Sequence, residues 1–348
     1  MTIAAFVDAP GAVLGDAGVP LHLGNPIAEG RVLEAGAWVL LPREVLRLTG
    51  PDRLTWLDSI TTQAIAQLPA GVSTESLVLS PEGRVEHAMR LVDDGESLWA
   101  IVDAGRAEAL EAWLTRMRFW AKVEIARVDA PVVGWTGSVA PEGTTWDDPW
   151  PTVAEGGVRY GASDDLGPWG WHETVVTGAL GEPPAIAGTL ALDARRIAAG
   201  RPTIADVDER TIPHELDWLA TAVHLAKGCY RGQETVAKVH NLGAPPRRLT
   251  LLHLDGSDAV LPQPGDDVVH GEQPVGHVTA AAHHHELGPV ALAILRRSVP
   301  TDAEVVVRAG DDDVAVAAAQ QVLVPPSAGH VHRPPRLPRL GAVRRPTA

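Results

Sequence analysis

The sequence predicts an α+β fold that ends in a small antiparallel β-structure. Short alternating segments at 76–79, 85–92 and 97–102 are separated by the turn sequences Pro-Glu-Gly and Asp-Asp-Gly, which predicts a three-stranded meander. Apolar residues at helical spacing over 104–119 predict a helix after it. From residue 248 onward, short alternating segments separated by Gly, Pro and Asp indicate a small antiparallel barrel or sandwich.

Two strands and a helix are expected before the meander. Residues 38–41 are apolar and residues 45–49 alternate, which favours strands. Asp52 follows a Gly-Pro turn and suits the N-cap of a helix whose apolar positions run from 54 to 65. Another alternating strand follows the helix after the meander, so residues 49–129 are expected to form a compact α+β unit.

The segments that follow are less regular. Residues 130–190 are interrupted by Gly and Pro, so only short elements are expected there. Residues 190–199 are expected to form a helix that ends at Gly200, because a proline follows at 202. Residues 214–223 are expected to form a second helix. Residues 325–348 are rich in Pro and Arg and are expected to be a disordered tail.

The composition excludes several classes of protein. With 348 residues, 45% of them hydrophobic, the chain can form two or three domains with substantial cores. No apolar stretch approaches the roughly 18 residues of a membrane span, and the N-terminus resembles neither a secretory signal nor a transit peptide, so a cytoplasmic location is expected. The net charge is −15, and five arginines lie in the tail, so direct nucleic-acid binding by the acidic body is not expected.

The segment around the single cysteine is the most informative about function. Its residues are Lys227, Gly228, Cys229, Tyr230, Arg231, Gly232, Gln233 and Glu234. The two glycines permit positive φ angles or a close approach of another group, which places the cysteine on a tight loop before a predicted helix over 233–241. Positive charge on Lys227 and Arg231 and the helix dipole favour the thiolate, so Cys229 is expected to be reactive. The alternative is a buried, structural thiol.

This octapeptide resembles the Lys-Gly-Cys-Tyr-x-Gly-Gln-Glu signature of the YgfZ-type folate-binding proteins. These proteins are relatives of the glycine cleavage T-protein, an aminomethyltransferase, and act in iron–sulfur cluster assembly or repair. Every fixed position of the signature is matched. Weaker similarities to the family lie at 48–52, 81–85, 195–202 and 274–278.

The resemblance implies three domains in a T-protein-like ring around a central hole that holds a folate. The first α+β domain would be discontinuous, with residues 1–48 and 130–243, and would carry the cysteine loop. Residues 49–129 would form the second α+β domain, and residues 244–324 a C-terminal antiparallel β-barrel.

The resemblance also implies a tetrahydrofolate-binding protein that supports cluster assembly or repair in client enzymes. Its partners would be those iron–sulfur enzymes and cluster assembly proteins, and any effect on tRNA modification would be indirect. Among the relatives an arginine ahead of an Ala-Gly pair helps to hold the folate, and Arg196 matches it. A guanidinium suits the carboxylates of the folate tail because it can bind each through two parallel hydrogen bonds.

Within the loop, Lys227 is expected to activate Cys229, which would attack or transiently hold a cluster-related sulfur or a one-carbon adduct. We expect Arg231 to contribute to the same positive field. Gln233 and Glu234 are expected to fix the loop by hydrogen bonds.

Two alternative functions remain open. The first is a folate-dependent aminomethyltransferase, but those enzymes carry an Asp-Asp pair where this chain has Glu86 and His87. Two tryptophans associated with folate in some relatives also fall on Arg43 and Leu192. The second alternative is a scaffold in which folate only stabilises the ring and Cys229 is structural.

The three consecutive histidines at 283–285 are the remaining candidate for ligand binding. Imidazoles bind metal ions, but these histidines lie in an Ala-rich, Gly-flanked stretch between predicted barrel strands, and adjacent residues in a row do not share one face. A solvated loop is therefore expected here, and no metal site is predicted.

Overall fold

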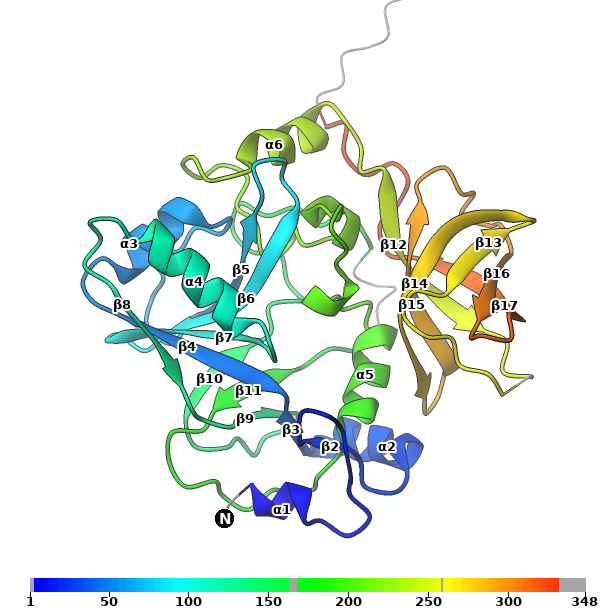
Figure 1. The fold of residues 1–348 in the computed structure, drawn as a ribbon, viewed down its shortest axis with the longest axis horizontal. Coiled ribbons are helices and arrows are strands. Elements are labelled where there is room, and N and C mark those ends of the chain that lie inside the picture. Colours follow the sequence, from blue (N-terminus) through cyan, green and yellow to red (C-terminus); the bar gives the residue numbers. More distant parts are fainter. Residues whose placement is uncertain (1–2, 163–167, 258, 332–348) are drawn as a thin grey trace, which may run out of the picture.

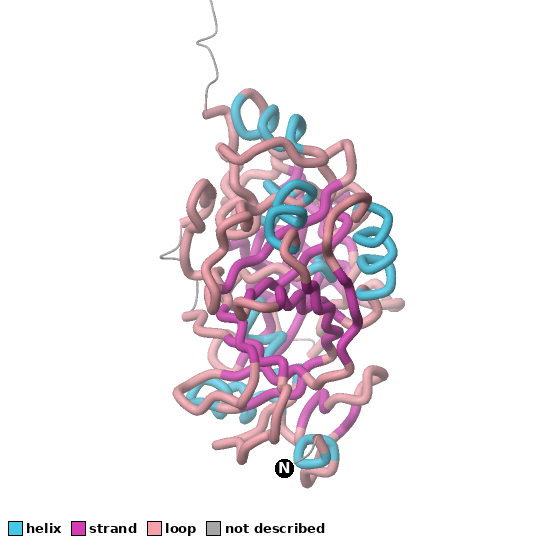
Figure 2. Tube along the Cα trace, turned by 90° about the vertical axis from the view of Figure 1, so that its left-hand side faces the viewer, coloured by secondary structure: helices cyan, strands magenta, loops and turns pink. Residues whose placement is uncertain are grey.

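Besides the small two-stranded sheet of β1 (Val13–Leu14) and β2 (Pro20–His22), two larger β-sheets and a closed β-barrel make up the computed structural model, which describes residues 3–162, 168–257 and 259–331 (Figure 1). We name them the first sheet, the second sheet and the barrel. In the view of Figure 2 the strands form the centre, and most helices lie around them. Within the described residues, no helix has the length and apolar character that crossing a membrane requires.

The second sheet is antiparallel, with the strand order β5-β6-β7-β4-β8. Its strands are β4 (Arg43–Thr49), β5 (Ser73–Leu79), β6 (Val85–Asp93), β7 (Ser97–Asp103) and β8 (Glu124–Val128). Leu46 and Leu48 face the helices α3 (Arg53–Ile60) and α4 (Ala107–Met117), whereas Val45 faces the core shared with the first sheet. The predicted meander is confirmed, and the sheet begins at β4, before the predicted boundary at 49.

The first sheet is antiparallel too, with the order β10-β11-β9-β3. The elements of this unit are α1 (Ala4–Val7), β1 (Val13–Leu14), β2 (Pro20–His22), α2 (Pro26–Gly36), β3 (Trp38–Leu41), β9 (Val132–Trp135), β10 (Thr144–Asp147), β11 (His172–Val175), α5 (Thr189–Ala198) and α6 (Gln233–Asn241). Helix α5 contacts α2 and the barrel, so it stands between the sheets and the barrel (Figure 1). It ends as predicted, with Gly200 in the left-handed region at φ +62°.

The barrel is closed, with the order β12-β15-β14-β13-β16-β17. Its strands are β12 (Arg247–Leu254), β13 (Asp267–His270), β14 (Gln273–His284), β15 (Gly288–Arg296), β16 (Val305–Ala309) and β17 (Val314–Val322). Alternation along β12 places Leu252 and Leu254 in the barrel core, while Leu249 and Leu251 pack on the core shared with the two sheets. The barrel is therefore joined to the rest of the chain by apolar contacts on its outer face.

The predicted helix over 214–223 is wrong. A 3₁₀ helix spans Pro213–Leu216, and the chain then continues through turns. Asp217 adopts a left-handed backbone with φ +56°, which an α-helix cannot continue through. Its carboxylate accepts a hydrogen bond of 2.7 Å from the N–H of Tyr160, so tertiary contacts fix this buried segment.

The predicted helix from Asp52 is shorter than expected and ends at Ile60. The Asp58 carboxylate accepts hydrogen bonds from the N–H groups of Ile65 (2.7 Å) and Ala66 (3.1 Å). These bonds turn the chain, so Ile65 reaches the core from a loop rather than from a helix.

The interpretation of 325–348 as a disordered tail is wrong for its first residues. Ala328 is buried, and the N–H groups of His330 and Val331 donate to the carbonyls of Gly243 and His240. Residues 325–331 therefore pack against the end of α6. Residues 332–348 lie outside the described residues.

Buried ion pairs join the first sheet unit to the second sheet. The guanidinium of Arg201 binds Glu75 of β5 at 2.7 Å and Asp148 at 2.9 Å, and all three side chains are almost fully buried. A second group links Arg43 of β4 to Glu173 of β11 at 3.0 Å. We call these pairs the ionic network. Because a buried charge without its partner is costly, the network favours the arrangement of the two units in which these charges meet.

Arg201→Met is expected to lower the free energy of unfolding by about 3–5 kcal/mol, since it leaves the carboxylates of Glu75 and Asp148 buried without their cation. Urea unfolding measures this. The control is Arg127→Met, whose pair with Glu111 is partly exposed and contributes about 0–1 kcal/mol. Equal small losses in the two variants would contradict the structural role of the network.

Candidate functional site

The Cys229 loop, residues 227–234, lies where the first sheet unit meets the second sheet, and its last two residues begin α6 (Figure 1). Cys229 is exposed. The neighbouring Tyr230 is buried and anchors the loop in the shared core, and the ammonium of Lys227 lies 5.7 Å from the centre of its ring. The loop thus has a buried base and an exposed thiol.

Lys227 holds the loop against the end of α3. Its Nζ donates to the carbonyls of Asp58 (2.5 Å), Thr61 (3.0 Å) and Gln63 (2.7 Å), and it lies 3.3 Å from the Asp58 carboxylate. Burial lowers the pKa of Lys227, while the Asp58 carboxylate opposes that effect. Carbonyls at a helix C-terminus lack intrahelical partners, so this ammonium satisfies them. The predicted role of Lys227 in activating the thiol stays a prediction.

The other polar residues of the loop are engaged in holding it. The guanidinium of Arg231 binds the Glu86 carboxylate of β6 through two hydrogen bonds, of 2.9 and 3.2 Å. Gln233 donates from Nε2 to the carbonyls of Lys227 (3.2 Å) and Gly228 (3.3 Å). Glu234 lies exposed in the first turn of α6. The positive charge next to Cys229 is therefore partly balanced by Glu86.

Gly232 is required by both conformation and space. Its φ is +82°, and a Cβ at this position would lie 2.6 Å from the carbonyl oxygen of Ser80 and 3.0 Å from the Cα of Gly83. The β5–β6 turn thus packs backbone against backbone on the start of α6. Gly228 has open space around it and no positive φ, so the expectation for the two glycines holds only for Gly232.

The positions that correspond to the Asp-Asp pair of aminomethyltransferases hold no free carboxylate pair. Glu86 is bound by Arg231. Burial, with a contribution from Arg106, lowers the pKa of His87 to about 4, so its imidazole is neutral at pH 7. The Nδ1 atom of His87 is buried and has no hydrogen-bond partner among the described residues.

The region around Arg196 does not fit a folate. The Arg196 guanidinium is bound to Asp193 at 2.9 Å and to Asp206 at 3.1 Å. The cavity beside it holds about 20 Å³, whereas sites for small molecules are usually ~300–1,000 Å³. Arg43 and Leu192 line the same cavity, and the ion pairs of Arg43 close it.

A larger cavity lies on the other side of α5, between this helix and the barrel. It holds about 460 Å³. Its lining residues are Glu34, Pro168, Arg195, Ala198, Ala199, His284, Glu286 and Leu287. None of the residues predicted to form the functional site lines it, because those residues lie on the loop or face the opposite side of α5.

Comparison with protein families and with known proteins gives similarities to one family model and to two relatives. Residues 247–325 match the family model described as the glycine cleavage T-protein C-terminal barrel domain. The chain is 26% identical over 246 residues to the tRNA-modifying protein YgfZ of Vibrio vulnificus, which covers 68% of this chain and 75% of that protein.

A second relative is a mitochondrial iron–sulfur cluster assembly factor homologue from Pyricularia oryzae. It is 26% identical over 231 residues, which are 62% of this chain and 56% of the relative, so the match spans just over half of that protein. Among solved structures, the chain resembles the glycine cleavage system aminomethyltransferase T of Bartonella henselae, with a TM-score of 0.70 and 18% identity over 93% of this chain and 95% of the other. That likeness shows the fold, a T-protein-like arrangement of two α+β units and a barrel.

Arg196→Gln is expected to reduce stability and to leave affinity for tetrahydrofolate as it is in the wild type. The reason is that its removal leaves Asp206 buried without a cation, at a cost of about 3–5 kcal/mol. Urea unfolding and calorimetric titration with tetrahydrofolate measure the two effects, with Arg195→Gln as the neighbouring control. An Arg196→Gln protein of normal stability that binds tetrahydrofolate at least tenfold more weakly than the wild type would contradict this account.

Proposed function

We propose that this chain, a YgfZ-type protein related to the glycine cleavage T-protein superfamily, supports the assembly or repair of iron–sulfur clusters in client enzymes. Cys229 is the residue that acts on the cluster or on a cluster-related group. The observation that carries this proposal is the exposure of Cys229 on a loop that Lys227 and Arg231 hold in place. A thiol with a purely structural role is ordinarily buried.

The partners proposed are iron–sulfur enzymes and cluster assembly proteins. One cysteine cannot hold a cluster alone, because clusters usually take four thiolate ligands. Cys229 would therefore share a cluster-related group with a partner that supplies the remaining ligands. Cys229 is exposed on the loop that leads into α6, and this helix lies at one end of the molecule, which leaves room for such a partner (Figure 1).

An influence on tRNA modification would be indirect in this proposal. The first relative is named as a tRNA-modifying protein. This chain has a net charge of −15, and phosphate binding depends mainly on Lys and Arg. An iron–sulfur enzyme that modifies tRNA is therefore a better-suited partner than the tRNA itself.

Folate binding in general is implied by the family relationship, and tetrahydrofolate is the form that we propose. Because the region around Arg196 does not fit this ligand, the proposed role of Cys229 does not depend on a folate bound there. The aminomethyltransferase alternative is disfavoured by the state of Glu86 and His87. One is bound to Arg231 and the other is neutral, so neither offers the free carboxylate that an Asp pair would.

Cys229→Ser is expected to abolish restoration of iron–sulfur client activity in cells that lack the native protein, because the hydroxyl is a poor ligand and nucleophile at neutral pH. Client enzyme activity at matched protein level is the measurement. The purified variant should unfold at the wild-type temperature, since the thiol is exposed.

The matched control is Gly228→Ala on the same loop. An added Cβ meets nothing within 4 Å there, so this variant should restore client activity fully. Full restoration by Cys229→Ser would contradict the proposed role of the thiol. Failure of both variants with lowered melting temperatures would show that the loop does not tolerate substitution. Failure of both at the wild-type melting temperature would contradict a role that belongs to the thiol alone.

A further inference from the structure

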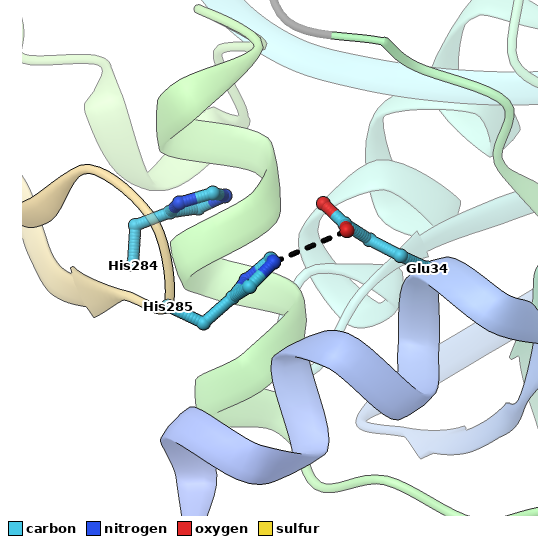
Figure 3. Close-up of side chains that lie close together, drawn as sticks. All are labelled: Glu34, His284 and His285. Carbon is cyan, nitrogen blue, oxygen red and sulfur yellow. Dashed lines mark hydrogen bonds and ion pairs between the residues drawn. The ribbon is translucent and has the colours of Figure 1, made fainter.

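Two of the three consecutive histidines meet a carboxylate from the other end of the chain. His284 ends β14, His285 begins the turn to β15, and Glu34 lies in the last turn of α2 (Figure 3). One ligand atom from each of the three residues lies within 4.8 Å of the others. We call this group the His–Glu cluster.

The expectation of a solvated loop is wrong for these two histidines. The side chain of His285 is 4% exposed, and His284 is 8% exposed. Because the strand ends at His284, the next residue no longer points to the opposite face, and the two rings lie 4.5 Å apart. His283 remains exposed, on the same face of β14 as Ala281 and opposite to Ala282 and His284.

A glycine in helix α2 leaves space for the ring of His285. Gly30 lies one helical turn before Glu34, so the two share a face. A Cβ on Gly30 would lie 3.0 Å from Nδ1 of His285, closer than ordinary contact. The absence of a side chain at Gly30 thus lets the imidazole pack on the helix, where its Nε2 reaches the Glu34 carboxylate at 3.1 Å.

Two imidazoles and one carboxylate form a ligand set that suits zinc and similar ions. Sites with three protein ligands keep a coordination position open for water or a small ligand. Glu34 and His284 also line the cavity of about 460 Å³, so an ion held here would have room for such a ligand. We propose that Glu34, His284 and His285 bind a divalent transition-metal ion of the zinc type, between α2 and the barrel.

Metal binding competes with hydrogen bonds that the free protein makes. Nδ1 of His284 accepts from the N–H groups of Glu286 and Leu287, both at 3.2 Å. Coordination through Nε2 places the proton on Nδ1, so these two bonds are lost, and the His285–Glu34 bond is replaced by two metal–ligand bonds. Arg195 lines the same cavity and opposes a cation. The affinity is therefore weaker than that of a closed structural zinc site.

Isothermal titration of the full, untagged chain with Zn²⁺ alone tests the site. The wild type should bind one equivalent, and His285→Ala and Glu34→Gln should each weaken binding at least tenfold. His283→Ala is the matched control, because it removes a neighbouring imidazole that lies outside the cluster. Equal losses in the His283 and His285 variants, or no binding by the wild type, would overturn the proposal.

A second readout separates this site from the cysteine loop and from folding. Co²⁺ bound to nitrogen and oxygen ligands gives visible absorption without a thiolate charge-transfer band, and this spectrum should persist in Cys229→Ala. Urea unfolding of Glu34→Gln without metal checks that the variant is folded. Loss of the spectrum in Cys229→Ala would assign the metal to the thiol and contradict the proposal, which does not depend on the proposed function.

Discussion

The structure depends on buried ion pairs between the first sheet unit and the second sheet. Each charge of the ionic network is shielded from water, so its energy is acceptable only when its partner is at hydrogen-bond distance. Arg201 between Glu75 and Asp148 meets that condition in one arrangement of the two units. Since the β5–β6 turn belongs to one unit and α6 to the other, the same arrangement sets how the turn meets the Cys229 loop.

The residues around Cys229 then have separate physical tasks. Tyr230 buries an aromatic ring, Lys227 satisfies the carbonyls at the end of α3, and Gly232 permits contact with the β5–β6 turn. Arg231 is neutralised by Glu86. These contacts come from both units, so the position of the loop depends on how the two units pack against each other. The thiol of Cys229 is left exposed at the surface of this assembly.

The ionic network also limits the volume of the cavity between the first sheet unit and the second sheet. The pairing of Arg43 with Glu173 closes the cavity beside Arg196. Space is found instead between α5 and the barrel, next to the His–Glu cluster. The chain thus has a T-protein-like fold in which buried charged side chains fill the space beside Arg196.

Local patterns predicted the parts of the fold that local physics decides. Period-two alternation located the meander and the barrel strands, and Gly200 marked the end of α5. The prediction of a helix over 214–223 is wrong because tertiary contacts of Asp217 override the helical pattern of this segment. At the site, the octapeptide motif identified Cys229 and also Gly232, which the contact with the β5–β6 turn requires. The partners of Lys227 and His285 could not be predicted, because they lie 160 residues or more away in the sequence, and no local pattern indicates such contacts.

Client activation is expected to need a Cys229 loop that is held in place by contacts with the second sheet and its helix α3, and not merely an exposed thiol. Lys227→Met tests it most directly, because the substitution removes the ammonium that binds the carbonyls of Asp58, Thr61 and Gln63 and leaves the thiol in place. The measurement is iron–sulfur client activity in cells whose only copy carries this variant at wild-type level. Activity should fall at least tenfold while Cys229 still reacts with a thiol reagent. Wild-type client activity in Lys227→Met would contradict it.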